Sequence, residues 1–398
     1  MTETTQGMVS PIKLIPAGLA IVASTYGLSR YTYGLFVPEI QAAFDLTTAS
    51  MGLIGSASYL GYLVATLFGS TVSGVLGPRL PVVLGGLAAA GGMALIALAP
   101  NTWVLVLGIM LAGTSPGLAY PPLSDAVMQL IAEPQQNRTY AVINSGTSVG
   151  VIIAGPAALL AADDWRLAWA GFALFAAAAT AWNASLMPSH GRTVARRKAE
   201  TPQRLRWRWL VGEKSHRLFA AATAFGLVSA VYWTFAVDLL GKTGSLPAGG
   251  SRVFWISIGV AGLLGGAAGD LTRRIGLRTT FRSALVGIAA AIAAIAIWPS
   301  SQPVVYASGL LFGGTFIMIT GLFGIWSVNV FQERPSAGFG ATFFLISAGQ
   351  LVGPAAAGLA ADRIGLPATF LISAAACCTI IAVGPRRDLF SMARTSSA

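Results

Sequence analysis

The sequence predicts an all-α polytopic membrane protein with twelve transmembrane helices in two pseudo-symmetric six-helix bundles. Three observations lead to this fold class: an apolar composition, long apolar runs along the whole chain, and landmarks of the first half that return about 200 residues later. Of the 398 residues, 55% are hydrophobic and only 10% are charged, against roughly 25% charged in soluble domains. This composition excludes a soluble globular enzyme, a disordered chain, a disulfide-rich secreted domain and a coiled coil.

Apolar runs bounded by charged or Pro- and Gly-rich segments mark the expected spans. Each span needs about 20 apolar residues, and the runs are continuous rather than alternating, which excludes an outer-membrane barrel. In chain order the expected spans cover residues 14–37, 52–76, 80–99, 103–125, 139–161, 166–187, 217–239, 253–270, 281–298, 303–330, 339–360 and 367–384.

A long basic segment separates the sixth span from the seventh. It carries Arg192, Arg196, Arg197, Lys198, Arg204, Arg206, Arg208 and Lys214. The sequence therefore predicts a six-helix bundle at 1–187, a basic cytoplasmic linker at 188–216 and a second six-helix bundle at 217–398. We interpret the charge of the linker as a topology signal that also contacts anionic lipid, and we expect no nucleic-acid partner.

The distribution of basic residues predicts the orientation in the membrane. With the N-terminus inside, only four of the 25 Lys and Arg residues, Arg166, Lys242, Arg252 and Arg363, fall in outer loops, and Arg30 lies within a span. Basic residues concentrate on the cytoplasmic side of membrane proteins. We therefore expect a bacterial inner-membrane or plasma-membrane protein with both termini in the cytoplasm.

The two halves of the chain match in register. The matching pairs are Gly27-Leu28 with Gly226-Leu227, Glu39 with Asp238, Gly113-Thr114 with Gly314-Thr315, Glu133 with Glu333, and Gly155-Pro156 with Gly353-Pro354. A repeat of six spans is parallel, so its copies are related by an axis along the membrane normal. Such an architecture supports a substrate site at the interface of the halves and alternating access by rocking.

A loop motif follows the second span of each half. The second-half copy reads Gly266-Ala-Ala-Gly-Asp270 and continues with Arg273, Arg274, Gly276 and Arg278, whereas the first-half copy has Gly74 where an Asp would stand. With these motifs and the six-plus-six arrangement, the chain resembles the major facilitator superfamily over essentially its whole length. The stretch from Gly27 to Pro38, with Tyr59 and Tyr62 after it, is similar to the YbfB/YjiJ-type branch. The resemblance implies the major facilitator fold and a monomeric transporter.

Arg30 is the most informative single residue. It lies about 12 Å from the outer end of the first span at 1.5 Å per residue, where a guanidinium costs about 2.5–3.5 kcal/mol on insertion scales and normally faces the bundle interior. Tyr26, Arg30 and Tyr33 would share one face of an α-helix. We interpret them as a cationic, aromatic-lined point that binds a carboxylate or another anion. The alternative is a structural arginine satisfied by backbone carbonyls or by Glu39 or Asp238.

Further candidates for substrate contact rest on the resemblance. In the superfamily the first, second, fourth and fifth spans of each half line the cavity, and polar or aromatic residues on these spans are Tyr59, Tyr62, Tyr120, Asn144, Tyr232, Trp255 and Gln350. For each of them, hydrogen bonding between helices or anchoring at the membrane interface is the alternative. Asn183 lies in a span that the family places at the periphery, so we expect it to hold helices together.

Charged residues near the ends of spans are candidates for gating or coupling. By family analogy Asp270, beside Arg273, pairs with Arg138 and closes the cytoplasmic side. Glu39 and Asp238, at outer ends of spans, are candidates for proton coupling, and uniport or exchange remains open. The two histidines flank the central linker and the two cysteines are neighbours, so we expect no metal site, no cofactor and no catalytic constellation.

The sequence therefore predicts a secondary or facilitative transporter of a small organic solute, favouring an organic anion recognised by Arg30. Broad-specificity efflux of amphipathic compounds by proton antiport is the alternative, because the Gly155-Pro156 pair resembles a motif of superfamily exporters. A polytopic membrane enzyme is the alternative from another class, and it lacks the residues that such chemistry needs.

Overall fold

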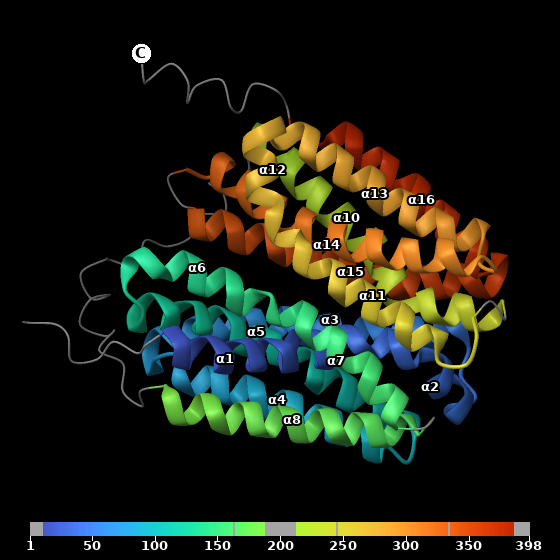
Figure 1. Cartoon of the computed structure of the whole chain (residues 1–398), viewed down its shortest axis with the longest axis horizontal. Coiled ribbons are helices and arrows are strands. Elements are labelled where there is room, and N and C mark those ends of the chain that lie inside the picture. Colours follow the sequence, from blue (N-terminus) through green and yellow to red (C-terminus); the bar gives the residue numbers. More distant parts are fainter. Residues whose placement is uncertain (1–10, 162–163, 188–211, 244–245, 333–334, 386–398) are drawn as a thin grey trace, which may run out of the picture. The chain divides into compact units, whose positions relative to one another are not determined.

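The computed structural model describes residues 11–161, 164–187, 212–243, 246–332 and 335–385. These ranges consist of helices and their connections, with no strand among them (Figure 1). They include 12 helical segments long and apolar enough to cross a membrane, from Pro11–Phe44 to Leu366–Val383. Each segment overlaps one expected span, so the all-α polytopic fold class and the number of spans are confirmed. The linker arginines from Arg192 to Arg208 lie outside the described residues.

The chain divides into two compact units by its internal contacts. The first comprises Met1–Leu46 and Ile54–Pro202, and the second comprises Thr47–Leu53 and Gln203–Ala398. The division between them along the chain falls inside the predicted linker. Nothing in the composition of Thr47–Leu53, at the start of one helix, indicated that this segment would group with the second half of the chain.

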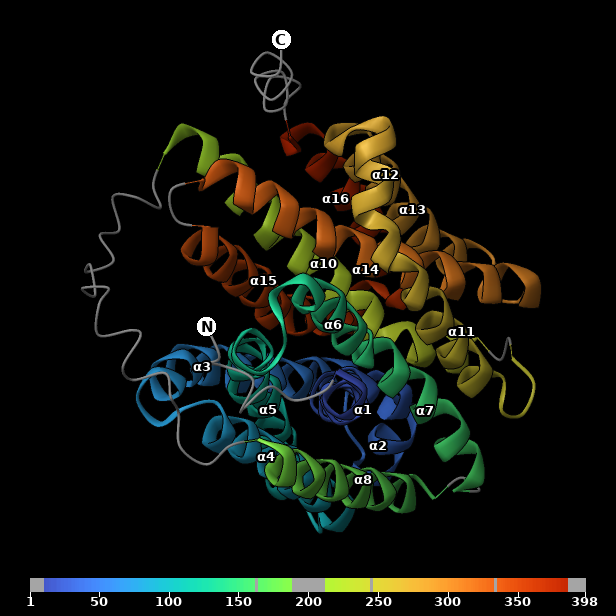
Figure 2. The same ribbon diagram turned by 60° about the vertical axis from the view of Figure 1, so that its left-hand side comes forward.

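The first unit contains the helices of the first six spans, apart from the start of α3 up to Leu53. They are α1 (Pro11–Val22), the π-helix η1 (Ala23–Tyr31), the 3-10 helix η2 (Thr32–Phe36), α2 (Val37–Phe44), α3 (Thr48–Leu76), α4 (Arg79–Leu98), α5 (Thr102–Leu130), α6 (Glu133–Asn144), α7 (Gly146–Leu160) and α8 (Trp165–Leu186). Within this unit α4 packs against both α5 and α8 (Figures 1 and 2).

The first span is an interrupted helix and not the regular α-helix that the sequence analysis assumed. Hydroxyl groups compete for its backbone carbonyls: Thr25 donates to Ile21 O at 2.8 Å, and Thr32 donates to Gly27 O at 2.8 Å. Such side-chain bonds to the preceding turn bend helices, and π-helical turns occur frequently at functional sites. The prediction that Tyr26, Arg30 and Tyr33 share an α-helical face was therefore wrong, because a π-helix has more residues per turn.

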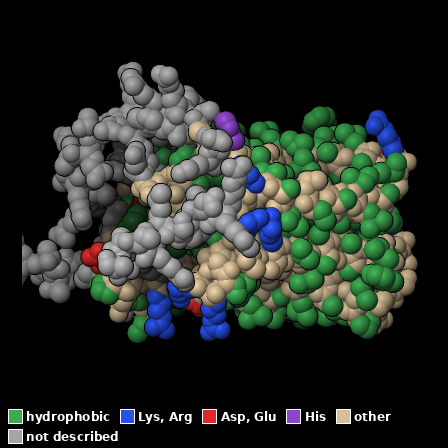
Figure 3. Space-filling view, turned by 90° about the horizontal axis from the view of Figure 1, so that it is seen from above, with side chains coloured by type: hydrophobic (Ala, Val, Ile, Leu, Met, Phe, Trp, Pro, Cys, Tyr) green, Lys and Arg blue, Asp and Glu red, His purple; other side chains and the backbone are tan. Residues whose placement is uncertain are grey.

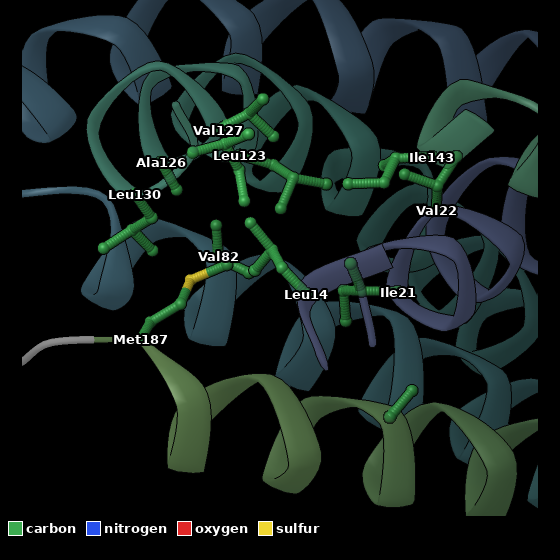
Figure 4. Packing of buried hydrophobic residues seen from close by; sticks show 12 residues of the cluster. Leu14, Ile21, Val22, Val82, Leu123, Ala126, Val127, Leu130, Ile143 and Met187 are labelled. Atoms are coloured by element: carbon green, nitrogen blue, oxygen red, sulfur yellow. The ribbon is translucent and has the colours of Figure 1, made fainter. Parts of the chain in front are cut away.

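Apolar side chains fill the interior of the first unit at one end of its helices. Leu14 and Ile21 of α1 pack with Leu123 and Val127 of α5 and with Val82 of α4 (Figure 4). In a membrane, such contacts stabilise the bundle through close packing, because lipid tails are as apolar as the side chains themselves.

The second unit contains α10 (Glu213–Lys242), α11 (Gly250–Leu264), η4 (Gly265–Ala267), α12 (Ala268–Ile275), α13 (Leu277–Ile297), α14 (Gln302–Val330), α15 (Pro335–Ile364) and α16 (Leu366–Val383). Aromatic rings hold α10 to α14: Phe225 stacks on Phe316 with centroids 5.6 Å apart, and Tyr232 stacks on Phe312 at 3.8 Å. Arg217 of α10 donates to the last carbonyls of α16, including Ala382 O at 2.8 Å.

The surface agrees with a membrane location. Hydrophobic side chains cover much of the face seen in Figure 3, and Lys and Arg are few there. Large apolar side chains such as Leu98 and Leu160 are 77% and 85% exposed. A soluble protein rarely exposes contiguous apolar surface, whereas lipid tails solvate it. The chain is therefore an integral membrane protein.

Asn183 has the helix-joining role that the sequence predicts. Its Nδ2 donates to Ala17 O of α1 at 2.7 Å and to Ala179 O of its own helix at 2.8 Å, and the side chain is fully buried. Interhelical hydrogen bonds in membranes contribute about 0.6 kcal/mol and at most about 1.7. We expect Asn183→Ala to lower the thermal unfolding midpoint in detergent by a few degrees and to leave transport per folded molecule unchanged. Loss of transport without loss of stability would contradict this role.

Candidate functional site

Arg30 lies inside the first unit among tyrosine rings. Its side chain belongs to η1, and the residue is only 5% exposed. The guanidinium carbon is 4.0 Å from the ring centroid of Tyr62 and 4.9 Å from that of Tyr59. It is 5.6 Å from the centroids of both Tyr26 and Tyr31. We call Arg30 with these four rings the tyrosine cage.

A chain of polar groups extends from the cage toward a more exposed part of the unit. The hydroxyls of Tyr26 and Tyr62 lie 3.3 Å apart, and the ring of Tyr26 meets that of Tyr120 edge-on at 5.3 Å. The hydroxyl of Tyr140 donates to that of Tyr120 at 2.6 Å, and Tyr120 donates to Asn144 Oδ1 at 2.7 Å. Tyr26, Tyr120 and Tyr140 are half-buried and Asn144 is exposed. The buried cation is therefore continuous with accessible hydrogen-bonding groups.

Close helix contacts hold these elements in place. A Cβ on Gly27 would lie 2.5 Å from the Cα of Gly150 and 2.7 Å from Thr147 O, so η1 and α7 touch backbone to backbone. On the other side the hydroxyls of Ser29 and Ser115 lie 2.9 Å apart and join η1 to α5. Small residues permit such approach in membrane helices. The π-helix that carries Arg30 is thus clamped between α5 and α7.

The arrangement suits an anion that also has an apolar or aromatic part. Ring faces stabilise a guanidinium by about 0.5–2 kcal/mol each, yet they leave its positive charge in place. A carboxylate can accept two parallel bonds from a guanidinium, and such charge-assisted pairs are about twice as strong as neutral ones. Tyrosine hydroxyls add donors and acceptors, and the ring edges add apolar surface.

The structure brings together six of the predicted contact residues: Arg30, Tyr26, Tyr59, Tyr62, Tyr120 and Asn144. Tyr33 is buried in η2, outside the cage as defined. Sequence reasoning missed Tyr31, because the residue after Arg30 would point elsewhere in an α-helix. It also missed Tyr140, although the spacing of Tyr140 and Asn144 places both on one face of α6.

Three predicted contact residues lie in the second unit. Tyr232 is fully buried against Phe312, and its hydroxyl lies 2.7 Å from that of Ser308. Trp255 is fully buried edge-on to Trp233 at 5.5 Å, and Gln350 of α15 is 2% exposed. Tyr232 and Trp255 contribute to the packing of their own unit, and a role in substrate contact stays a prediction for all three.

The predicted gating and coupling residues have different surroundings. Asp238 is buried and bonds to Lys242 Nζ at 2.8 Å, and Lys242 also donates to Thr48 Oγ1 at 3.1 Å. Asp270 pairs with Arg273 one turn along α12, and both are exposed. Glu39 is half-buried in α2 and Arg138 is exposed on α6. The pairing of Asp270 with Arg138 stays a prediction.

The described part of the chain contains no group of three or more His, Cys, Asp or Glu residues that could hold a metal ion.

Sequence comparison relates the chain to one protein family and to relatives with two different names. The family model described as "Major Facilitator Superfamily" matches residues 19–354. The "Transcription regulatory protein OpdE" of Pseudomonas aeruginosa is 29% identical over 343 residues, which cover 83% of this chain and 82% of OpdE. The "Multidrug resistance protein MdtH" of Yersinia pestis is 32% identical over 190 residues, which cover 43% of this chain and 47% of MdtH.

Solved structures share the fold at low sequence identity. A mutant of the nucleoside transporter NupG superposes with a TM-score of 0.74 at 14% identity, and the match covers 95% of this chain and 100% of the NupG chain. A bacterial homologue of the human lysosomal transporter Spinster, in an inward-facing and unoccupied conformation, superposes with a TM-score of 0.75 at 13% identity and covers 94% of this chain and 96% of its own. At these identities the likeness concerns the fold.

Proposed function

The chain belongs to the major facilitator superfamily and is a membrane transporter, not an enzyme; from this premise we propose that it carries a small organic anion by alternating access. Arg30 supplies the cationic contact, and the hydroxyls of Tyr26, Tyr62 and Tyr120 supply hydrogen bonds. The observation that carries the proposal is a guanidinium enclosed by four tyrosine rings within a membrane-spanning segment.

The charge of Arg30 is the reason to favour an anion. A charged group at membrane depth is costly and usually marks a substrate or ion pathway. A bound carboxylate would offset that cost. Tyr120 and Tyr140, which are half-buried, and the exposed Asn144 offer further contacts for the rest of the solute. A carboxylate joined to an aromatic or otherwise apolar body fits these features better than a small inorganic anion.

Efflux of amphipathic compounds by proton antiport is the second candidate. It is favoured by the likeness of about half the chain to a protein named for multidrug resistance. The aromatic interior of the second unit, where Trp233 contacts both Trp255 and Phe312, is in keeping with apolar solutes. In this case Glu39 or Asp238 would carry the coupling proton and Arg30 would be structural.

Two further features belong to the same proposal. The charge bias of the loops supports a location in the cytoplasmic membrane with both termini in the cytoplasm. We also propose that a single copy of the chain forms the functional transporter, as expected for the family.

Counterflow in proteoliposomes tests the proposal. Vesicles containing the purified protein are preloaded with one unlabelled compound and offered a trace of the same labelled compound, across a panel of aromatic and aliphatic carboxylates and of amphipathic cations. We expect accumulation for at least one carboxylate and none in protein-free vesicles. Accumulation of amphipathic cations alone would overturn the organic-anion proposal in favour of efflux.

A further inference from the structure

A second cationic feature lies in the second unit, at the start of α13. This helix begins at Leu277, after Gly276 with a φ of 81°. Arg278 and Arg282 follow one turn apart, so both side chains lie on the same face of the helix. Like charges at this spacing destabilise a helix. The pair is therefore unfavourable by itself and becomes favourable once an anion lies between the two side chains.

The two arginines line a pocket. Its described lining consists of Arg278, Thr279, Arg282, Ser283 and Val286. Both arginines are half-buried, and the Nε atom of each is buried without a hydrogen-bond partner among the described residues. A buried donor of a charged group that lacks an acceptor destabilises the folded protein more than a neutral one does. Asp270, on the helix that precedes α13, pairs with Arg273.

The lining changes from polar to apolar along the helix. Arg278 and Thr279 are in the first turn, where the helix dipole also favours negative charge. Val286 lies one turn beyond Arg282 and is 55% exposed. The segment Leu277–Ile297 is membrane-spanning by length and composition, so the arginines lie within the first six residues of a span. At this position in a span we expect lipid headgroups beside the arginines and acyl chains beginning beside Val286.

We propose that this pocket binds the phosphate group of an anionic phospholipid. The guanidinium forks of Arg278 and Arg282 hold the phosphate oxygens, a geometry for which arginine is better suited than lysine. The hydroxyls of Thr279 and Ser283 are placed to contact the headgroup, and Val286 contacts the start of the acyl chains. A free phosphate shares the charged half of this chemistry, whereas only a lipid also covers Val286.

Native mass spectrometry of the full-length protein in detergent tests the proposal. The protein is titrated with phosphatidylglycerol, with phosphatidylcholine, or with inorganic phosphate. The variants are the double substitution Arg278→Gln with Arg282→Gln and the control Lys13→Gln with Arg274→Gln. The control removes the same charge from exposed positions. Each basic residue near a membrane surface contributes about 1 kcal/mol toward anionic lipid.

The expected result is tighter binding of phosphatidylglycerol than of phosphatidylcholine, with roughly thirtyfold weaker binding in the Arg278 and Arg282 variant and unchanged binding in the control. Equal weakening in both variants would overturn the site, because it would show attraction by net charge alone. If inorganic phosphate binds the protein as tightly as phosphatidylglycerol does, the lipid assignment is overturned and the pocket is a phosphate site. Retained size-exclusion behaviour and thermal midpoint show that the variant is folded.

Discussion

Arg30→Ala is expected to abolish transport of the organic anion that the wild-type protein carries. The substitution removes the guanidinium from the tyrosine cage and with it a pair of charge-assisted hydrogen bonds to the solute. Each hydrogen bond to a charged group contributes about 1.5–3 kcal/mol, so the loss of the pair corresponds to a fall of roughly a hundredfold or more in transport at low solute concentration. Initial rates in proteoliposomes, normalised to the amount of folded protein, measure it.

Two further variants separate recognition from structure. Arg30→Lys keeps the charge without the planar fork, and we expect it to retain roughly a tenth of the wild-type rate. Arg166→Ala removes a second arginine that contacts rings, since its guanidinium carbon lies 4.5 Å from the Trp165 centroid. Arg166 also donates to Ala97 O and Ala99 O at 3.0 and 2.8 Å. Its loss should lower stability and leave transport per folded molecule intact. Equal rates in wild type and Arg30→Ala would make Arg30 dispensable.

Gly226→Ala should destabilise the second unit strongly. A Cβ at this position would overlap the carbonyl oxygen of Ile346 and lie 3.1 Å from the backbone nitrogen of Gln350. Helices α10 and α15 would have to separate, and overpacking of this kind costs about 3 kcal/mol. We expect a fall of many degrees in the thermal unfolding midpoint, or failure to accumulate in the membrane, both measured against wild type in the same detergent.

Gly171→Ala is the matched control. Gly171 lies on α8, and a Cβ there would have no neighbour within 4 Å. Alanine is a better helix former than glycine by about 1 kcal/mol, so the midpoint should stay the same or rise slightly. A similar loss of stability in both variants would show that close packing at Gly226 is not the cause.

The sequence predicted the fold well because a membrane restricts the possible structures. Apolar runs of about 20 residues can satisfy their backbone groups in lipid only as helices, so each run from 14–37 to 367–384 became a helical span. Leucines such as Leu98 and Leu160 are exposed on the protein surface, because the surroundings of a span are apolar too. Hydropathy therefore finds the spans without any knowledge of which side chains are buried. The same reasoning says little about the ends of helices, and Thr47–Leu53 grouped with the second half for reasons of packing that composition does not encode.

The site was predicted in part. Arg30 was identified because a charge within a span is rare, and Tyr59, Tyr62, Tyr120 and Asn144 followed from the spans expected to line the cavity. Tyr26 was predicted from its spacing to Arg30 on an α-helical face, and the structure places it beside Arg30 on a π-helix instead. Tyr31 was missed because the sequence analysis assumed an α-helix where the structure has a π-helix. In this segment side-chain hydroxyls compete with backbone N–H groups for carbonyl oxygens, as the Thr25 hydroxyl does for Ile21 O. Single hydroxyls do not predict such a turn, since many Ser and Thr residues in helices make similar bonds without changing the helix type.

The central claim is that Arg30 recognises an organic anion, and ligand-induced thermal stabilisation tests it most directly. Purified wild type and Arg30→Ala are heated in detergent with each member of a panel of organic carboxylates and amphipathic cations. A ligand that binds only the folded state stabilises it by about 2.7 kcal/mol at a hundredfold excess over Kd. We predict that at least one carboxylate raises the midpoint of the wild type and not that of Arg30→Ala. Equal stabilisation of both proteins by carboxylates, or stabilisation by amphipathic cations alone, would contradict the claim.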